Sequence, residues 1–298
     1  SITGDIAKGN EMYIEAAKTG HLDTNLFIAS GLIDMYVRCG SLAKAQAVFH
    51  TISNRNIVVW NSLIAGYAQQ EYGEEALHYF ERLHQEGLCP NAITFSCSLK
   101  ACGSASTTAA KKGRAIHADI ARNGLLGKNI FIGSALVDMY AKCGELAKAQ
   151  EVFDMLPERN VVTWGALITA YSQLGRAENT LSIFDEMIKQ GNKPDRVVFL
   201  SILNACSHAG MIDKGQTYFE AMSVQYGIPS TMEHHTTIID LLGRAGQLEW
   251  ALEMMMKTPF HPTNVMWLAL LGACRKWHNV EVGRYAFDQA VRSNEKED

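Results

Sequence analysis

His84-Gln-Glu86 is a stretch of this chain whose residue types and spacing match part of a catalytic motif. In zinc-dependent nucleobase deaminases, an H-x-E pair supplies a zinc ligand and the glutamate that moves the proton, and a later P-C-x-x-C supplies further ligands. The 7 cysteines of the chain include no C-x-x-C pair, so those ligands are missing. We interpret the match as chance, and we predict that the chain holds no metal and no other cofactor.

Other residues with suggestive chemistry are better explained by packing. They are Cys39, Cys143, Cys206 and Cys274 at turns between predicted helices, the pair His234-His235 near a predicted helix start, and Met254-Met-Met256 in a helical run. Small thiols and flexible thioethers fill gaps in apolar cores. The sequence also has no Ser/His/Asp arrangement, Walker loop or Rossmann fingerprint. It therefore predicts that the chain is not an enzyme.

Composition and charge narrow the remaining functions. Apolar residues make up 47% of the chain and charged residues 19%, which is typical of a folded protein. The net charge of −4 excludes binding of nucleic acid through a broad cationic surface, but not through a narrow groove. The odd, scattered set of cysteines argues against a disulfide framework and indicates a reducing compartment. No apolar run is long enough to span a bilayer, so we expect no membrane contact.

Internal repetition is the strongest signal in the sequence. Residues 32–49 return with few changes as residues 136–153, and residues 59–64 return as residues 163–168. A weaker copy runs over residues 238–248. Repetition at this scale is typical of solenoids, in which each unit packs against its neighbours.

Each unit is predicted to form two short helices. In residues 57–91, Leu63, Ile64 and Tyr67 share one helical face, and Leu77 and Phe80 share a face of a second helix after a break. Two helices of this size cannot bury their apolar faces alone, whereas stacked pairs can. Since no period-2 strand pattern occurs, the sequence predicts an all-α solenoid of helix-turn-helix repeats.

The unit boundaries follow from the repeated residues. The units run over 26–56, 57–91, 92–129, 130–160, 161–195, 196–231, 232–263 and 264–298, after a partial unit 1–25. Their lengths alternate between short, standard and long. This alternation argues against tetratricopeptide repeats, whose period is a regular ~34 residues.

Several motifs in these units resemble the pentatricopeptide repeat (PPR) family. They are Val161-Val-Thr-Trp-Gly-Ala-Leu-Ile168, Phe184-Asp-Glu-Met187 and Lys193-Pro-Asp195. The order of short, standard and long units resembles the PLS subclass of land-plant organellar PPR proteins. The resemblance implies a right-handed superhelix, with a partial long-type repeat over 1–25 and a PLS array over 26–263.

The end of the chain resembles the end of such an array. Residues 200–210 and 239–246 are similar to the last long and short repeats of the subclass. Residues 265–275, followed by 279–283, resemble its first extension (E-type) motif. The resemblance therefore implies an extension motif over 264–298.

The resemblance also implies a function, which is sequence-specific binding of single-stranded RNA to select a cytidine for C-to-U editing of organellar transcripts. The implied partners are RNA and, through the extension motif, a deaminase module or editing-factor proteins, with no small-molecule substrate. Any deaminase domain would lie beyond residue 298 or be supplied by another protein. The implied location is the chloroplast or the mitochondrion of a plant. The chain opens at Ser1 on helix-like sequence without a transit peptide, so we expect it to be a piece of a longer protein.

In this family one repeat reads one base through its fifth and last residues, a scheme that is general for such repeats. Carried onto this chain, the pairs are Ser30/Asn56, Asn61/Asn91, Ser96/Asn129, Ser134/Asn160, Gly165/Asp195, Leu200/Thr231 and Thr236/Thr263. Ser or Thr with Asn favours adenine in the family, and Asn with Asn favours a pyrimidine. The third pair lies in a long-type repeat, which reads bases poorly. Gly165 brings no side chain, Leu200 cannot form a hydrogen bond, and Thr236/Thr263 matches no established pair.

Two further sets of residues could contact RNA, the first by resemblance to the family and the second by its recurrence at position 13 of the short units. The second residues of the units would wedge between bases, and they are Phe27, Val58, Ile93, Phe131, Val162 and Val197, with Glu233 interrupting the series. The cations Arg38, Lys142 and Arg244 would contact phosphates. From the residues alone, the first set could instead start helices on an apolar face. The second could instead be solvated helix ends, where cations favour the helix dipole.

Two alternatives to an RNA-binding editing factor stay open. A helical-repeat scaffold would bind a peptide in its groove, but invariant polar anchors are expected there, and the fifth and last residues vary. The chain could also be the RNA-binding part of a longer DYW cytidine deaminase.

Overall fold

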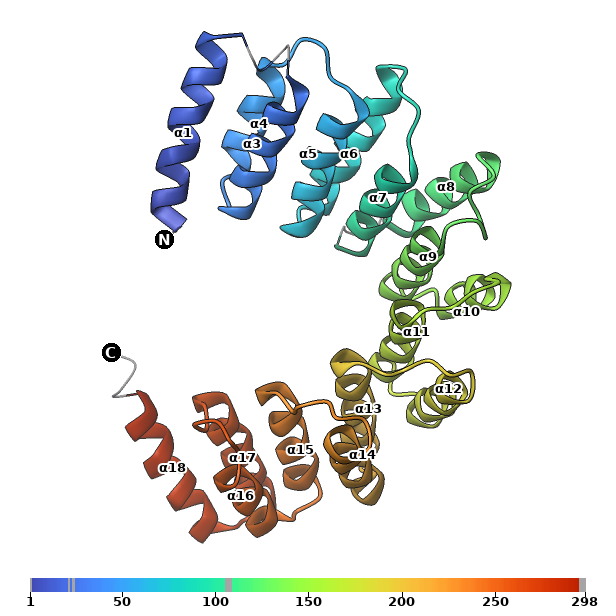
Figure 1. Cartoon of the computed structure of the whole chain (residues 1–298). Helices are drawn as coiled ribbons and strands as arrows, with labels where there is room; N and C mark the ends of the chain where they lie inside the picture. Colours follow the sequence, from blue (N-terminus) through green and yellow to red (C-terminus); the bar gives the residue numbers. More distant parts are fainter. Residues whose placement is uncertain (1, 21, 23–24, 105–108, 295–298) are drawn as a thin grey trace. The chain divides into compact units, whose positions relative to one another are not determined.

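The computed structural model describes residues 2–20, 22, 25–104 and 109–294, which form helices and no strand (Figure 1). After α1 (Ile2–Lys18), the helices come in antiparallel pairs. The predicted all-α solenoid of helix-turn-helix repeats is confirmed. Within the described ranges, none of the helices is long and apolar enough to cross a bilayer.

Helix starts coincide with the unit starts found in the sequence. The first helices of the pairs are α3 (Leu26–Arg38), α5 (Ile57–Gln69), α7 (Ala92–Ser104), α9 (Ile130–Lys142), α11 (Val161–Gln173), α13 (Arg196–Ala209), α15 (Met232–Arg244) and α17 (Asn264–Trp277). The second helices are α4 (Leu42–Thr51), α6 (Gly73–Gln85), α8 (Ala109–Arg122), α10 (Leu146–Met155), α12 (Ala177–Lys189), α14 (Ile212–Val224), α16 (Leu248–Met256) and α18 (Val280–Asn294). The partial unit 1–25 and the extension 264–298 each include a few positions outside the described residues, and their repeat types stay predictions.

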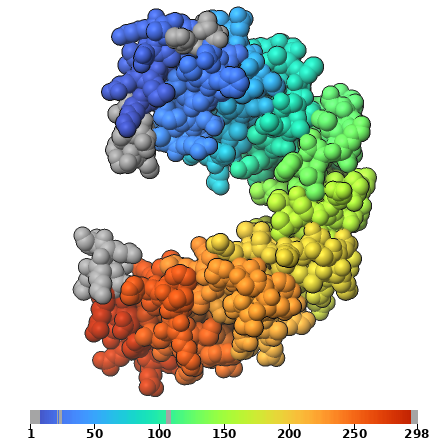
Figure 2. Space-filling view, in the orientation of Figure 1, coloured from blue at the N-terminus to red at the C-terminus, as the bar shows by residue number. Residues whose placement is uncertain are grey.

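The chain divides into two compact units, residues 1–159 and residues 160–298. In the first unit α3 packs on α5, α5 on α7 and α7 on α9; in the second, α11 packs on α13, α13 on α15 and α15 on α17. The second helices pack mainly on these first helices, and side chains fill the space between neighbours within each unit (Figure 2). Since the first helices lie closest together, they form the inner layer of each unit.

In the pairs whose connecting residues the structure describes, the turn holds one residue in the left-handed conformation, which closes the end of the first helix. Glycine adopts this conformation without a steric cost, and Gly40 and Gly144 do so at φ 71° and 77°. Residues 57–91 place Glu71 there instead, at φ 64°. The break that the sequence predicted between the two helices of this unit is therefore this turn.

The core lies between the two helices of each pair. Leu63, Ile64 and Tyr67 of α5 are buried, as are Leu77 and Phe80 of α6, in agreement with the predicted faces. Burial of each such side chain removes apolar surface from water and is worth about 1.5–3 kcal/mol.

An arginine fixes the turn at the end of two of the short units, residues 26–56 and 130–160. The Arg55 Nε donates a hydrogen bond to the Phe49 carbonyl at 3.0 Å, and its guanidinium lies 4.7 Å from the centre of the Phe49 ring. Arg159 makes the same two contacts with Phe153, at 2.9 Å and 4.7 Å. The equivalence of the two copies in the sequence thus extends to their side-chain contacts, and each arginine sets the start of the following first helix.

Gly66 of α5 gives a test of how closely the first helices pack. A Cβ atom built on Gly66 would lie 2.4 Å from a methyl carbon of Val37, which is buried and stiff at χ1. We expect Gly66→Ala to lower the free energy of unfolding by about 1–3 kcal/mol, because an overpacked core must shift. Urea denaturation measures the change.

Gly31 of α3 is the matched control, since nothing lies within 4 Å of a Cβ built on it. Gly31→Ala should raise stability by roughly 0.5–1 kcal/mol through helix propensity alone. Equal effects of the two substitutions would contradict the close contact between α3 and α5.

Candidate nucleic-acid interface

The last residue of each unit stands directly before the next first helix. Asn56, Asn129, Asn160, Asp195, Thr231 and Thr263 are the N-cap residues of α5, α9, α11, α13, α15 and α17, and Asn91 holds the same place before α7. The first backbone N–H groups of a helix have no partner within it, and a side-chain oxygen at the N-cap satisfies them. Except for Thr263, whose side chain makes no capping bond, and Thr231, the predicted last-position residues fill this role.

Capping decides which atom an N-cap side chain offers to a ligand. The Asn56 Oδ1 accepts hydrogen bonds from the backbone N–H groups of Val58 and Val59, both at 3.1 Å. The amide nitrogen of an asparagine held this way is left as a donor. The Asp195 Oδ1 accepts the Val198 N–H at 2.9 Å, so the other carboxylate oxygen is left as an acceptor.

The predicted fifth-position residues all lie on first helices, in the inner layer. Ser30, Asn61, Ser96, Ser134, Gly165 and Thr236 belong to α3, α5, α7, α9, α11 and α15. The hydroxyls of Ser30 and Thr236 donate to backbone carbonyls of their own helices at 3.2 Å and 2.9 Å. A hydroxyl that donates to its own helix offers a ligand its acceptor lone pairs.

Asn61 and Asn91 are a predicted pair that the structure brings into direct contact. The Asn61 Nδ2 donates to the Asn91 Oδ1 at 3.2 Å. The Thr94 hydroxyl donates to the Asn61 Oδ1 at 2.7 Å, and the Asn91 Oδ1 also accepts the Thr94 backbone N–H at 3.0 Å. The pair is therefore ordered before any ligand binds.

Gly165 lies beside the helix that Asp195 caps. A Cβ on Gly165 would stand 3.5 Å from Val198, which is ordinary contact, so the missing side chain leaves space there. The pair Ser134/Asn160 divides between the two compact units, with the Ser134 hydroxyl donating to the Ile130 carbonyl at 2.8 Å.

The second residues of the units are exposed although they are apolar. The exposed fraction runs from 47% at Val58 to 85% at Phe27 across Phe27, Val58, Ile93, Phe131, Val162 and Val197. A residue that begins a helix on a buried apolar face would be covered, and these are not. Each stands two positions after an N-cap residue, so a flat apolar ligand could stack close to the capping group.

The junction before α15 differs from the others. The Thr231 hydroxyl lies 2.5 Å from a carboxylate oxygen of Glu233 and 2.7 Å from the His234 Nδ1. The hydrogen bond from Thr231 lowers the pKa of Glu233, and burial lowers the pKa of His234. The single hydrogen of the Thr231 hydroxyl is therefore used within the chain, and the second residue of this unit, Glu233, is an anion.

Each cation predicted to contact phosphate has an aspartate one helical turn before it. Arg38 pairs with Asp34 at 3.8 Å, Lys142 with Asp138 at 2.8 Å, and Arg244 with Asp240 at 2.7 Å. Exposed pairs of this kind are worth only about 0.3–0.5 kcal/mol, so the cation can exchange its partner. The aspartate nevertheless cancels much of its charge, which agrees with the modest net charge of the chain.

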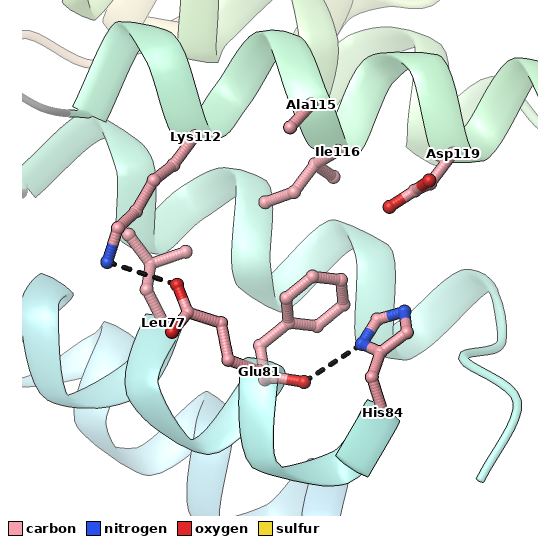
Figure 3. Close-up of a pocket in the computed structure, with 8 residues that line it drawn as sticks. Leu77, Glu81, His84, Lys112, Ala115, Ile116 and Asp119 are labelled. Atoms are coloured by element: carbon pink, nitrogen blue, oxygen red, sulfur yellow. Dashed lines mark hydrogen bonds and ion pairs between the residues drawn. The ribbon is translucent and has the colours of Figure 1, made fainter. Parts of the chain in front are cut away.

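A cavity of about 270 Å³ lies between α6 and α8, in the outer layer (Figure 3). Its apolar lining includes Phe80 and Ile116. The Lys112 ammonium at its rim is paired with Glu81 at 3.3 Å, and the His84 Nδ1 lies 3.0 Å from the Phe80 carbonyl. Glu86 faces a different partner, Arg55, at 3.5 Å, so the H-x-E match brings no acid–base pair into the cavity.

The buried cysteines have the properties of packing residues. Burial raises the pKa of Cys102 to about 12 and that of Cys206 to about 11, so both thiols stay protonated at neutral pH. A thiol must lose its proton to act as a nucleophile or a metal ligand. Across the described part of the chain, no group of three or more His, Cys, Asp or Glu residues could hold a metal ion.

Sequence reasoning missed two residues of the interface. Asn25 caps α3, with its Oδ1 accepting the N–H groups of Phe27 and Ile28 at 3.2 Å and 3.4 Å. The match of residues 25–28 (Asn-Leu-Phe-Ile) to residues 129–132 (Asn-Ile-Phe-Ile) carried this signal. Thr94 had no such signal, because its role depends on a contact between two units.

Models of a known protein family match several of these repeats. The PPR repeat family model matches residues 55–104 and 159–208, and the PPR repeat model matches residues 134–161, 197–225 and 233–257. A pentatricopeptide repeat-containing protein of Arabidopsis thaliana, named as mitochondrial, is 37% identical over 95% of this chain and 45% of its own length. Another from the same plant is 42% identical over 93% of this chain and 33% of its own length. The chain thus spans less than half of either relative.

A solved structure supports the fold. The crystal structure of the pentatricopeptide repeat protein PPR10 in complex with an 18-nt psaJ RNA element aligns with 94% of this chain at a TM-score of 0.75 and 16% identity. The alignment covers 42% of that protein. At this identity the likeness concerns the fold alone.

Asn56 tests whether the N-cap contact stabilises the repeat junction. Asn56→Ala should lower the free energy of unfolding by about 1 kcal/mol, because the first N–H groups of α5 lose their acceptor. Asn56→Asp keeps an oxygen in place and should change stability by only a few tenths of a kcal/mol. Thermal or urea unfolding of the two variants measures the difference, and equal losses would contradict the capping role.

Proposed function

This chain belongs to the pentatricopeptide repeat family, and from that premise we propose that it binds single-stranded RNA in a sequence-specific manner, one base to a repeat. The observation that carries the proposal is the ordered contact of Asn61 with Asn91 at a capped repeat junction, beside the exposed side chains of Val58 and Ile93. An apolar side chain for stacking and a polar pair for the base edge are the two elements that recognition of an unpaired base needs.

The atoms left by capping suggest which bases fit. Asn56 offers a donor and Ser30 an acceptor, which complements the N1 acceptor and the N6 amino group of adenine. Ser134 and Asn160 bring the same two residue types. Asp195 offers an acceptor without help from Gly165, so it favours a base with an N–H on its edge, guanine or uracil.

The phosphate contacts in this proposal come from Arg38, Lys142 and Arg244. Each is exposed and, among the described residues, forms its ion pair with an aspartate of its own helix, so a phosphate can take the place of the aspartate. A small number of such contacts suits a chain whose net charge is negative.

The proposal extends to C-to-U editing of chloroplast or mitochondrial transcripts, with this chain as the site-recognition part. A relative named as mitochondrial supports an organellar location. The chain itself would perform no catalysis, and the deaminase would be a further domain of a longer protein or a separate partner.

The extension 264–298 is the proposed surface for that partner. At its fifth position Leu268 is exposed and cannot form a hydrogen bond to a base edge. Val265, Trp277 and Phe287 are also exposed on α17 and α18, which gives the extension apolar surface suited to protein contact.

Asn61→Ser tests base reading at one repeat. A serine would offer an acceptor beside the donor of Asn91, and this pair complements adenine. We expect the preference at a single nucleotide to move from pyrimidine to adenine, by roughly 1–3 kcal/mol. Selection from a randomised single-stranded RNA pool, followed by direct binding to single-nucleotide variants, measures the change.

Asn54→Ser is the matched control, because Asn54 lies exposed in the turn before Asn56 and outside the reading positions. It should leave the selected sequence unchanged. If Asn61→Ser weakened all RNAs alike, or if the chain selected no RNA and bound peptides instead, a protein-binding scaffold would explain the fold better.

A further inference from the structure

Thr94 is a polar residue with no exposed surface at the junction between residues 57–91 and residues 92–129. Its hydroxyl accepts the backbone N–H of Asn91 at 3.1 Å and lies 2.7 Å from the Asn61 Oδ1. The Asn91 Oδ1 is also near the hydroxyl, at 3.0 Å. Since a hydroxyl has one hydrogen to donate, the shorter contact identifies the Asn61 oxygen as its acceptor.

The side-chain amides of Asn91 and Asn61 are oriented by a series of hydrogen bonds that starts at the backbone. The Thr94 N–H donates to the Asn91 Oδ1, which fixes the Asn91 amide. That oxygen accepts the Asn61 Nδ2, which fixes the nitrogen end of Asn61. A reversed Asn61 amide would place its oxygen against the Asn91 oxygen, so the Asn61 oxygen must face Thr94.

Building on the proposed RNA binding, we propose that Thr94 is a positioning residue that holds the Asn61 amide as a hydrogen-bond donor and thereby favours cytosine over uracil at this repeat. In this arrangement Asn61 and Asn91 each keep an amide N–H for the base. Cytosine presents two adjacent acceptors, N3 and O2, to such a pair. In uracil an N3–H group lies between the two carbonyl acceptors, and this group would face an amide N–H of the protein, donor against donor.

Burial makes the position of Asn61 depend on the Thr94 hydroxyl. Asn61 is only 7% exposed, and the Thr94 hydroxyl donates a hydrogen bond to its side-chain oxygen. A buried acceptor without a donor is unfavourable. Without the hydroxyl, only the hydrogen bond to the Asn91 Oδ1 would hold this orientation. The amide would then give up that bond and turn its oxygen toward the ligand, where it could accept the uracil N3–H or an amino group.

Thr163 provides an internal comparison. It is equally buried, occupies the same third position of its unit, and donates to the N-cap oxygen of Asn160 at 2.9 Å. The unit before it carries Ser134 at the fifth position, which has no amide to orient. Thr163 therefore shares the capping role of Thr94, but the fifth residue of the preceding unit is a serine instead of an asparagine.

The test compares Thr94→Val, Thr94→Ser and Thr163→Val in the full chain, using a randomised single-stranded RNA pool and then RNAs that differ only in cytosine or uracil. Asn61→Ser first identifies the nucleotide that this repeat reads. Thr94→Val should reduce the cytosine-to-uracil preference there by about fivefold or more. Thr94→Ser keeps the hydroxyl and should retain the preference, and Thr163→Val should leave it unchanged.

The outcomes separate the inference from the proposed function. If the unmodified chain selects no RNA sequence, the proposed function itself is wrong. If it selects cytosine at the nucleotide identified by Asn61→Ser and Thr94→Val keeps that preference, the role of Thr94 is wrong. If Thr94→Val and Thr163→Val lower all affinities and the unfolding temperature equally, Thr94 acts only as a capping residue.

Discussion

The hydrogen bond from the first N–H groups of a helix to a side-chain oxygen at its N-cap is the contact on which the proposed reading site depends. At Asn56, Asn129 and Asp195 one oxygen accepts the first N–H groups of the next helix, and the remaining polar atom is turned away from them. Asparagine then presents a donor and aspartate an acceptor, although both cap a helix equally well. The same contact thus stabilises the junction between repeats and determines what a base would meet there.

The proposed stacking side chains, unlike the capping residues, are separate from the packed core of a repeat. The core between paired helices is closed by residues such as Trp60 and Leu63, which face away from the interface. The stacking candidates Phe27 and Phe131 add little to that core, since they are exposed. A repeat can therefore change an exposed second residue without repacking its core, whereas Gly66, held against Val37, cannot change without strain.

Much of the fold was predictable from the sequence because each unit carries its own helical signals. The apolar faces of α5 and α6 and the starts of the first helices could be read directly from the repeated residues. The contact of Asn61 with Thr94 could not be predicted, since it joins residues of neighbouring repeats and depends on how closely α5 packs on α7. The aspartate partners of Lys142 and Arg244 sit one turn away in the sequence, but their effect on phosphate binding follows only from the short distances.

The most direct measurement of the central claim is the base preference of an Asn91→Asp variant, read from RNA selection together with its unfolding temperature. The substitution keeps the capping oxygen and replaces the outward donor by an acceptor. The account predicts an unchanged unfolding temperature. It also predicts that the base preference changes at one nucleotide only, from a base whose edge accepts hydrogen bonds to one whose edge donates. At that nucleotide the preference for uracil over cytosine should rise by about fivefold or more. An unchanged nucleotide preference in a stably folded variant would contradict it.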